Sequence, residues 1–219
     1  MKPISECRLY AFLDTTYLNG RSPETIAEAL CIGGADIIQL RAKGSAADEI
    51  LALARRIKPL LDEAEVWLVI NDFPEIARAI GAPLSHLGQE DFFESGFGHV
   101  SEVPGVTEGL RIGLSSHAPA QAERAIAAGA HYIAIGPVWP TPTKSGAKPV
   151  TLDYVRWAAA SVRIPWFAIG GITLQNLDDV LAAGATRICV VSAILNASDS
   201  AKACQSFKDR LISAPPIKP

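Results

Sequence analysis

A short sequence element recurs along this chain at intervals of about 50 residues. In each copy a Gly-Ala pair follows a helical pattern and comes just before a short apolar run. The copies begin at Gly34, Gly81, Gly129 and Gly184. An element that joins a helical pattern to an apolar run predicts alternating helices and strands, and chains of this kind fold around a parallel sheet.

Four more apolar segments lie between these runs, which brings the number of strand candidates to eight. In chain order they are residues 9–13, 36–40, 66–70, 84–87, 111–114, 132–135, 166–169 and 188–191. Helical patterns fill most of the intervals, at residues 22–31, 46–61, 74–80, 118–128, 152–160, 174–183 and 198–211. Only the segment after the fourth strand has no clear pattern.

Eight strand-and-helix units predict an α/β protein with a single (β/α)8 fold, the TIM barrel, over residues 1–219. Residues 214–219 are expected to form a frayed tail. A doubly wound nucleotide-binding fold is the alternative. It is disfavoured because the chain contains neither G-x-G-x-x-G nor G-x-x-x-x-G-K-[ST], the glycine-rich motifs that bind phosphate in such folds.

The composition excludes several classes of protein. Hydrophobic residues make up 49% of the chain and the net charge is −3, without the basic runs that bind nucleic acid. No apolar stretch is long enough for a membrane helix and the N-terminus lacks a signal-peptide pattern, so we expect a cytoplasmic protein. The four cysteines are scattered, which argues against a zinc module or a disulfide framework.

Polar residues follow almost every predicted strand. In a TIM barrel the loops after the strands form the active face, so these residues are expected to converge there. They are Gln39 to Lys43 after strand two, Asn71 and Asp72 after strand three, Gln89 to Asp91 after strand four, Ser115 to His117 after strand five, Thr141 to Lys144 after strand six, Gly170 and Gly171 after strand seven, and Ser192 after strand eight.

The charges in this set predict a site for a polyphosphate carried with Mg²⁺. Arg41, Lys43 and Lys144 would place cations on one rim, beside the carboxylates of Asp72 and Asp91. Mg²⁺ prefers one or two carboxylates together with waters and phosphate oxygens. Taken singly, each residue also has a plainer explanation, in which the cations are a solvated rim and Asp72 caps the next helix.

A second anion site is predicted on the other side of the same face. Gly170 and Gly171 would let the backbone approach a phosphate, as the loops after strands seven and eight do in many barrels. Thr141 and Thr143 offer hydroxyl donors in a proline-rich loop whose tail, residues 145–148, could act as a lid. The alternatives are a tight turn without ligand and an ordinary surface loop.

Read in order, these motifs resemble the thiamine phosphate synthase family, also called thiamine-phosphate pyrophosphorylase. The strings that carry the resemblance are Gln39-Leu40-Arg41 with Lys43, Asn71-Asp72, His86 to Asp91 (HLGQED), Ile112 to Ser115, Gly136 to Lys144 with its TPTK end, Ala168 to Ile172, and Val191 to Ile194. The resemblance implies a transferase that joins 4-amino-5-hydroxymethyl-2-methylpyrimidine diphosphate to 4-methyl-5-(2-phosphoethyl)thiazole and releases pyrophosphate.

The resemblance also implies a role for each matching residue. Asp72 and Asp91 would bind Mg²⁺ on the diphosphate. The pyrimidine diphosphate would be held by Arg41, Lys43, Asn71 and Lys144, and its ring by Gln39 and Ser115. The thiazole phosphate would be held, partly through backbone groups, by Thr141, Thr143, Gly171, Val191 and Ser192. Leu40, Ala42 and Pro142 complete the expected binding set, and Arg41, Lys43, Ser115 and Lys144 are the expected catalytic residues.

Three other functions remain open at this point. One is a thiazole tautomerase of the same barrel family, which would need no metal and would use a histidine near strand five, where His117 lies. The second is a phosphate-binding barrel without catalysis, although such a protein would not need Asp72 and Asp91 beside an anion. The third is another phosphate-binding barrel enzyme, such as a sugar-phosphate epimerase or a tryptophan-pathway enzyme. The sequence predicts small-molecule partners only and leaves the oligomeric state open, a homo-oligomer included.

Overall fold

The computed structural model describes residues 1–141, 143 and 149–214. Within them, parallel strands close into a barrel in the order β1 to β8, and β8 pairs with β1. The strands are β1 (Leu9–Asp14), β2 (Ile37–Arg41), β3 (Trp67–Asn71), β4 (Leu84–Leu87), β5 (Arg111–Ser116), β6 (Tyr132–Ile135), β7 (Trp166–Ile169) and β8 (Ile188–Val190). All of the predicted strands are therefore confirmed, and the doubly wound alternative is excluded.

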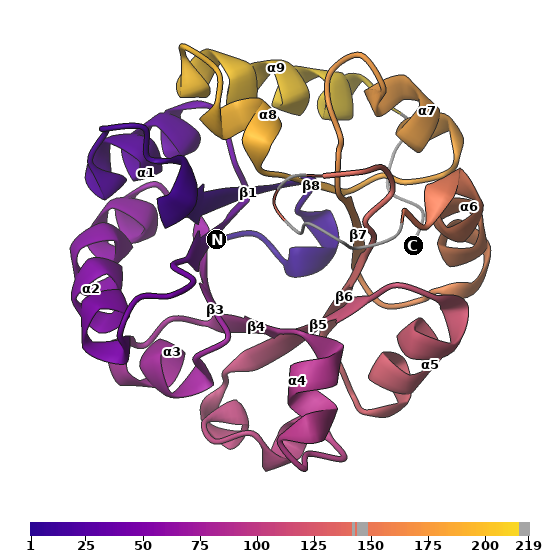
Figure 1. The fold of residues 1–219 in the computed structure, drawn as a ribbon, viewed down its shortest axis with the longest axis horizontal. Helices are drawn as coiled ribbons and strands as arrows, with labels where there is room; N and C mark the ends of the chain where they lie inside the picture. The colour runs from indigo at the N-terminus through magenta and orange to yellow at the C-terminus, as the bar shows by residue number, and fades with distance from the viewer. Residues whose placement is uncertain (142, 144–148, 215–219) are drawn as a thin grey trace.

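Helices form a ring outside the barrel (Figure 1). They are α1 (Pro23–Ile32), α2 (Ala47–Glu63), α3 (Pro74–Ile80), α4 (Gln89–Glu94), α5 (Pro119–Ala127), α6 (Thr151–Ser161), α7 (Leu177–Ala182), α8 (Ser192–Leu195) and α9 (Ser200–Ser213). The sequence predicted each helix except α4 and α8, which are among the shortest. Of the predicted tail, residues 215–219 lie outside the described residues.

The recurring Gly-Ala pair is the turn that ends a helix and starts the next strand. Gly34, Gly81, Gly129 and Gly184 all have positive φ, between 66° and 100°. In each pair the alanine N–H then donates to a carbonyl five residues earlier, in the last turn of the helix. This is the Schellman arrangement, in which glycine takes the left-handed position without steric cost. The alanines are buried, so a small side chain suits the junction between helix and barrel.

The N-terminal segment closes the bottom of the barrel. The 3₁₀ helix η1 (Ile4–Glu6) lies across the far end of the barrel in the view of Figure 1. Ile4 and Cys7 are buried there, and the indole N–H of Trp67 donates to the Lys2 carbonyl at 2.8 Å. The segment therefore plugs the end that the strand amino termini form.

A buried carboxylate holds this closed end together. Oδ2 of Asp36 accepts hydrogen bonds from the backbone N–H groups of Arg8 at 2.8 Å and Leu9 at 2.9 Å. Its Oδ1 pairs with Lys2 at 2.6 Å and Lys208 at 2.5 Å. Burial alone would raise the pKa of Asp36, but these hydrogen bonds outweigh burial and lower the pKa. Asp36 thus ties the N-terminal segment, β1 and α9 together at the end away from the predicted site.

Candidate active site

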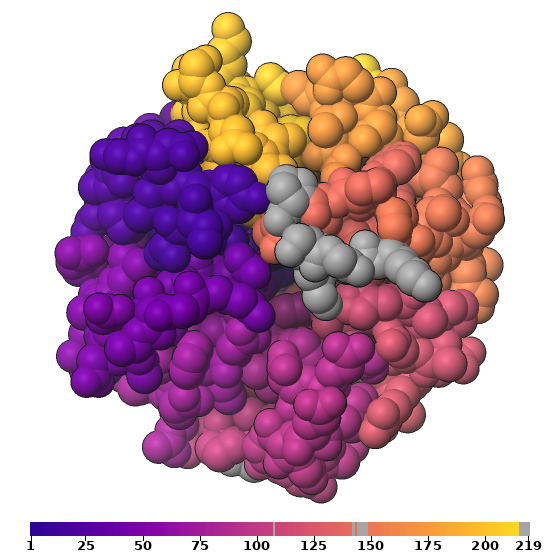
Figure 2. All heavy atoms as spheres, viewed as in Figure 1, coloured from indigo at the N-terminus to yellow at the C-terminus, as the bar shows by residue number. Residues whose placement is uncertain are grey.

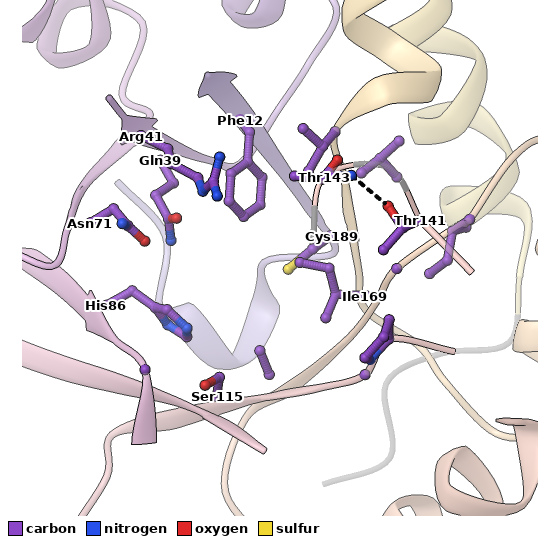
Figure 3. A pocket seen from close by; sticks show the side chains of 18 of the residues that line it. Phe12, Gln39, Arg41, Asn71, His86, Ser115, Thr141, Thr143, Ile169 and Cys189 are labelled. Carbon is purple, nitrogen blue, oxygen red and sulfur yellow. Dashed lines mark hydrogen bonds between the residues drawn. The ribbon is translucent and has the colours of Figure 1, made fainter. Parts of the chain in front are cut away.

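A pocket of about 200 Å³ opens at the carboxyl end of the barrel. In Figure 2 this face is hollowed near the barrel axis, and Figure 3 shows side chains from several strands pointing into the hollow. The predicted site residues that line it are Gln39, Arg41, Lys43, Asn71, Asp72, Asp91, Ser115, Thr141, Thr143, Gly171, Val191 and Ser192. Residues from seven different strand ends therefore converge, as the barrel fold requires.

Of the other predicted residues, Leu40 and Ala42 are described and do not line the pocket. Both are buried. Successive residues of a strand face opposite sides, so Gln39 and Arg41 point into the pocket and Leu40 between them does not. Pro142, Lys144 and the predicted lid at residues 145–148 lie outside the described residues.

Arg41 is held by a carboxylate that the sequence analysis missed. Asp14 ends β1 directly beside Arg41 in the strand register, and its Oδ2 forms an ion pair with the Arg41 guanidinium. The other carboxylate oxygen accepts from the N–H of Thr16 at 3.0 Å and from its hydroxyl at 2.7 Å. Asp14 is almost fully buried, so it fixes the direction of Arg41 at the rim.

Two carboxylates face the pocket beside the cations. Asp72 follows β3 with φ at +63°, and its N–H donates to the His86 carbonyl at 2.9 Å. Burial raises the pKa of Asp72, the nearby Lys43 ammonium opposes this rise, and the charge of Asp91 adds to it. The helix cap considered for Asp72 is wrong, because Phe73 occupies the N-cap of α3 and no side chain caps it.

Asp72 and Asp91 carry the kind of oxygen ligands that Mg²⁺ prefers. Both carboxylates line the pocket, and Lys43 Nζ lies 3.6 Å from Asp72 Oδ2. Across the described residues, no three His, Cys, Asp or Glu side chains gather into a complete metal site. A hard cation held by two carboxylates would take its remaining oxygen ligands from waters and phosphate, which is the usual coordination of Mg²⁺ in proteins.

The loop after β5 is fixed by hydrogen bonds to its neighbours. The Ser115 hydroxyl accepts from the N–H of Gln89 at 3.2 Å, which links β5 to the start of α4. The backbone N–H of His117 donates to Gln121 Oε1 at 2.7 Å, and its Nδ1 donates to the Gly136 carbonyl. His117 therefore holds the start of the loop after β6.

On the opposite side of the pocket, the loops after β1, β6 and β7 contact one another. Gly171 has φ at +64°, and a Cβ there would lie 2.8 Å from both the Pro140 carbonyl oxygen and Trp139 Cβ. Only glycine allows this approach without displacement. The Thr143 hydroxyl lies 3.1 Å from the Tyr17 hydroxyl, and the Thr143 N–H donates to Thr141 Oγ1 at 3.3 Å (Figure 3).

Other residues in the pocket or beside it received no role from the sequence. Asp14 could have been found, because it is a carboxylate directly after the first apolar strand, where the other strands carry site residues. His86 lines the pocket from β4 and belongs to the HLGQED string. Cys189 lines it from β8, and burial raises the pKa of its thiol well above the ordinary value, which keeps the thiol protonated. All four cysteines are free thiols.

Comparison with known proteins decides the family. Residues 9–194 match the family model described as thiamine monophosphate synthase. The chain belongs to the thiamine monophosphate synthase family. Its relatives include the thiamine-phosphate synthase of Thermus thermophilus, 45% identical over 185 residues, 84% of this chain and 86% of that protein. The thiamine-phosphate synthase of Acidothermus cellulolyticus is 41% identical over 213 residues, 96% of this chain and 98% of that protein.

A solved member of the family has the same architecture. The thiamine phosphate pyrophosphorylase of Pyrococcus furiosus superposes with a TM-score of 0.81 at 26% identity, covering 96% of this chain and 98% of that chain. The family resemblance that the motifs predicted is therefore confirmed, and the tautomerase, binding-protein and other phosphate-barrel alternatives are not favoured. No helix in the described part of the chain has the length and apolar character needed to span a membrane.

Proposed function

We propose that this protein is a thiamine phosphate synthase that uses Mg²⁺. It would join 4-amino-5-hydroxymethyl-2-methylpyrimidine diphosphate to 4-methyl-5-(2-phosphoethyl)thiazole and release pyrophosphate and thiamine phosphate. The observation that supports this best is that Asp72 and Asp91 share one pocket with the cations Arg41 and Lys43. Two carboxylates next to an anion site would repel the anion unless a metal ion lay between them.

The two substrates would occupy opposite sides of the pocket. We assign the diphosphate to Arg41, Lys43, Asn71 and Lys144, and the pyrimidine ring to Gln39 and Ser115. The thiazole phosphate would lie against the loops that follow β6, β7 and β8, at Thr141, Thr143, Gly171, Val191 and Ser192. This division is supported by the cations and carboxylates on one side of the pocket, and by the close backbone approach at Gly171 and the hydroxyls of Thr141 and Thr143 on the other.

The reaction requires charge stabilisation and alignment. The bond between the pyrimidine methylene and the diphosphate oxygen breaks, and its electron pair leaves with the pyrophosphate. The 4-amino group delocalises the positive charge that develops on the methylene, and the thiazole nitrogen then donates its lone pair to form the new C–N bond. Bound Mg²⁺ would supply positive charge to the departing pyrophosphate. Arg41, with its direction fixed by Asp14, and Lys43 would add to this stabilisation.

No protein nucleophile takes part in this scheme. The Cys189 thiol stays protonated because burial raises its pKa, and the Ser115 hydroxyl already accepts a hydrogen bond from the Gln89 N–H. The Nδ1 of His117 donates to the Gly136 carbonyl in the loop after β6. The chain's contribution is to hold both substrates with their reacting atoms in line, which alone can lower the barrier by several kcal/mol. We place the enzyme in the cytoplasm, acting on small molecules.

A direct assay tests the proposal. Purified protein is incubated with both substrates and Mg²⁺, and thiamine phosphate and pyrophosphate are followed together, with each substrate omitted in turn and with EDTA. Equal amounts of both products, abolished by EDTA and restored by excess Mg²⁺, are expected. Folded protein that yields neither product would contradict the proposal. Tautomerisation of a thiazole carboxylate phosphate by the same preparation, without metal, would support the isomerase instead.

A further inference from the structure

A chain of hydrogen bonds crosses the barrel core beneath the pocket. Gln39 Nε2 lies 2.6 Å from the Tyr10 hydroxyl, which lies 3.3 Å from the Tyr132 hydroxyl. The Tyr132 hydroxyl in turn lies 3.3 Å from His86 Nδ1. Gln39 and His86 both line the pocket, from β2 and β4, and Figure 3 shows their side chains pointing into it. Two fully buried phenols therefore link these two pocket side chains.

The directions of these hydrogen bonds depend on one another. A phenol has one proton to donate, and burial raises the pKa of Tyr10 and Tyr132 so that both keep that proton. Because Gln39 Nε2 donates to the Tyr10 oxygen, Tyr10 donates to Tyr132, and Tyr132 donates to His86 Nδ1. His86 then carries its proton on Nε2. With Gln39 Nε2 as the donor at one end, any other order would leave a buried hydroxyl proton in this chain without an acceptor, which is costly.

The packing around the phenols keeps their hydroxyl groups in register. The Tyr10 ring stacks on Phe12 with centroids 5.4 Å apart and meets the edge of Phe167 at 5.4 Å. The Tyr132 ring lies over Gly113, where a Cβ would be only 2.0 Å from Tyr132 Cζ. Glycine at that position thus makes the room that Tyr132 needs. The phenols have fixed places in the core, so their hydroxyls act as fixed partners for Gln39 and His86.

We propose that Tyr10 and Tyr132 are positioning residues that set the hydrogen-bonding pattern read by the pyrimidine ring. With Nε2 of Gln39 turned to Tyr10, the amide carbonyl is the group that faces the pocket, as an acceptor. His86 presents its Nε2–H as a donor. A 4-aminopyrimidine has the complementary pattern, because its amino group donates and its ring nitrogens accept. A 4-oxopyrimidine has the reverse pattern, since its carbonyl accepts and the adjacent ring N–H donates. This inference rests on the proposed function.

Binding measurements on conservative variants test the proposal. Tyr10→Phe and Tyr132→Phe keep the rings and remove the hydroxyls, which frees the Gln39 amide and the His86 ring to reverse. The 4-oxo analogue of the pyrimidine diphosphate serves as a competitive inhibitor, so its affinity is measured without turnover of the analogue. The preference is the inhibition constant of the 4-oxo analogue divided by the KM of the 4-amino substrate. We expect this ratio to fall by about tenfold in both variants, with a change in KM rather than in kcat.

Tyr154→Phe is the matched control. Tyr154 is also a buried phenol, with its hydroxyl bonded to Ser116 at 2.9 Å and to the Ala118 carbonyl at 2.8 Å, but it is not part of the chain to His86. We expect Tyr154→Phe to leave the preference unchanged. An equal loss of preference in Tyr154→Phe, or an unchanged preference in Tyr10→Phe, would overturn the proposal.

The His86 tautomer gives a second readout that does not depend on activity. At about pH 8, above the ordinary histidine pKa of about 6.5, ¹⁵N chemical shifts report which ring nitrogen carries the proton. His86→Asn identifies the signal among the four histidines. We expect the Nε2–H form in the wild type and a mixture in Tyr132→Phe, whereas an Nδ1–H form in the wild type would overturn the proposal. Absence of turnover in the wild type would contradict the proposed function, and the tautomer measurement would still decide the inference.

Discussion

Replacement of Asp36 by asparagine should weaken the fold and leave catalysis intact. Asp36 lies at the closed end of the barrel, away from the pocket. In Asp36→Asn the amide oxygen can replace Oδ2 and keep the hydrogen bonds from the N–H groups of Arg8 and Leu9. The amide NH₂ would then replace Oδ1 and face the ammonium groups of Lys2 and Lys208, donor against donor. The substitution therefore removes two ionic contacts without removing volume.

The size of the effect follows from the burial of the two lysines. The Lys208 side chain is 16% exposed, and a charge-assisted hydrogen bond in such a place contributes about 2 kcal/mol. The Lys2 side chain is 39% exposed, so solvent screening reduces its contribution to about 0.5–1 kcal/mol. The free energy of unfolding should fall by about 3 kcal/mol, which for a chain of this size lowers Tm by about 6–12 °C.

The pH dependence of this difference has a definite sign. The pKa of Asp36 is lowered in the folded protein, so its charge stabilises the fold at every pH above its ordinary value of 3.8. That contribution disappears as the pH falls through the lower, folded-state pKa. The difference in unfolding free energy between the wild type and Asp36→Asn should therefore be constant from about pH 5 to 7 and should decrease only below about pH 3.8.

Urea unfolding across this pH range, together with kcat/KM at 25 °C, measures both halves of the prediction. A difference in unfolding free energy of less than about 1 kcal/mol at pH 7 would refute the stabilising role of the two ionic contacts. A difference that does not decrease in acid would refute it as well. A fall in kcat/KM in protein that remains folded would contradict the assignment of this end of the barrel to stability alone.

Two further substitutions test the pocket. Asp91→Asn should raise the Mg²⁺ concentration needed for half-maximal activity by at least about tenfold, with little loss of stability. Glu90→Gln, at the exposed neighbouring carboxylate, should change neither the Mg²⁺ requirement nor the stability. An Asp91→Asn enzyme as active as the wild type would refute the metal assignment. Gly171→Ala should lower the free energy of unfolding by about 2–4 kcal/mol and raise KM for the thiazole phosphate, because the new Cβ would clash with Trp139. Gly81→Ala, with φ at +66° and open space around it, should lower the free energy of unfolding by only about 1 kcal/mol. Equal losses of unfolding free energy in the two variants would contradict the close approach at Gly171.

The strands and most helices could be predicted because local patterns determine them. The Gly-Ala repeat marks the left-handed turn before a strand, and each strand is an apolar run buried on both faces. The segment after β4 could not be predicted, because it consists of the six-residue helix α4 and two 3₁₀ turns, η3 (Val100–Glu102) and η4 (Val106–Glu108). Such short elements have too few residues to show a period.

The pocket was predicted better than the residues that support it. Side chains after the strands converge because the barrel brings all carboxyl ends to one face, so Arg41, Asp72 and Asp91 could be placed from the strand pattern alone. The pairing of Asp14 with Arg41 depends on the register of β1 against β2, which no local pattern reveals. The Tyr10 and Tyr132 hydroxyls were missed for a similar reason, because a tyrosine inside an apolar strand has the same pattern as any core residue.

One time course tests the central claim most directly. ³¹P NMR of a single mixture of the protein, both substrates and Mg²⁺ resolves the pyrimidine diphosphate, the thiazole phosphate, pyrophosphate and thiamine phosphate together. The account predicts that pyrophosphate and thiamine phosphate rise at equal rates, and that neither forms when the thiazole phosphate or Mg²⁺ is left out. Pyrophosphate that forms without thiamine phosphate, or a mixture that does not change in the presence of folded protein, would contradict it.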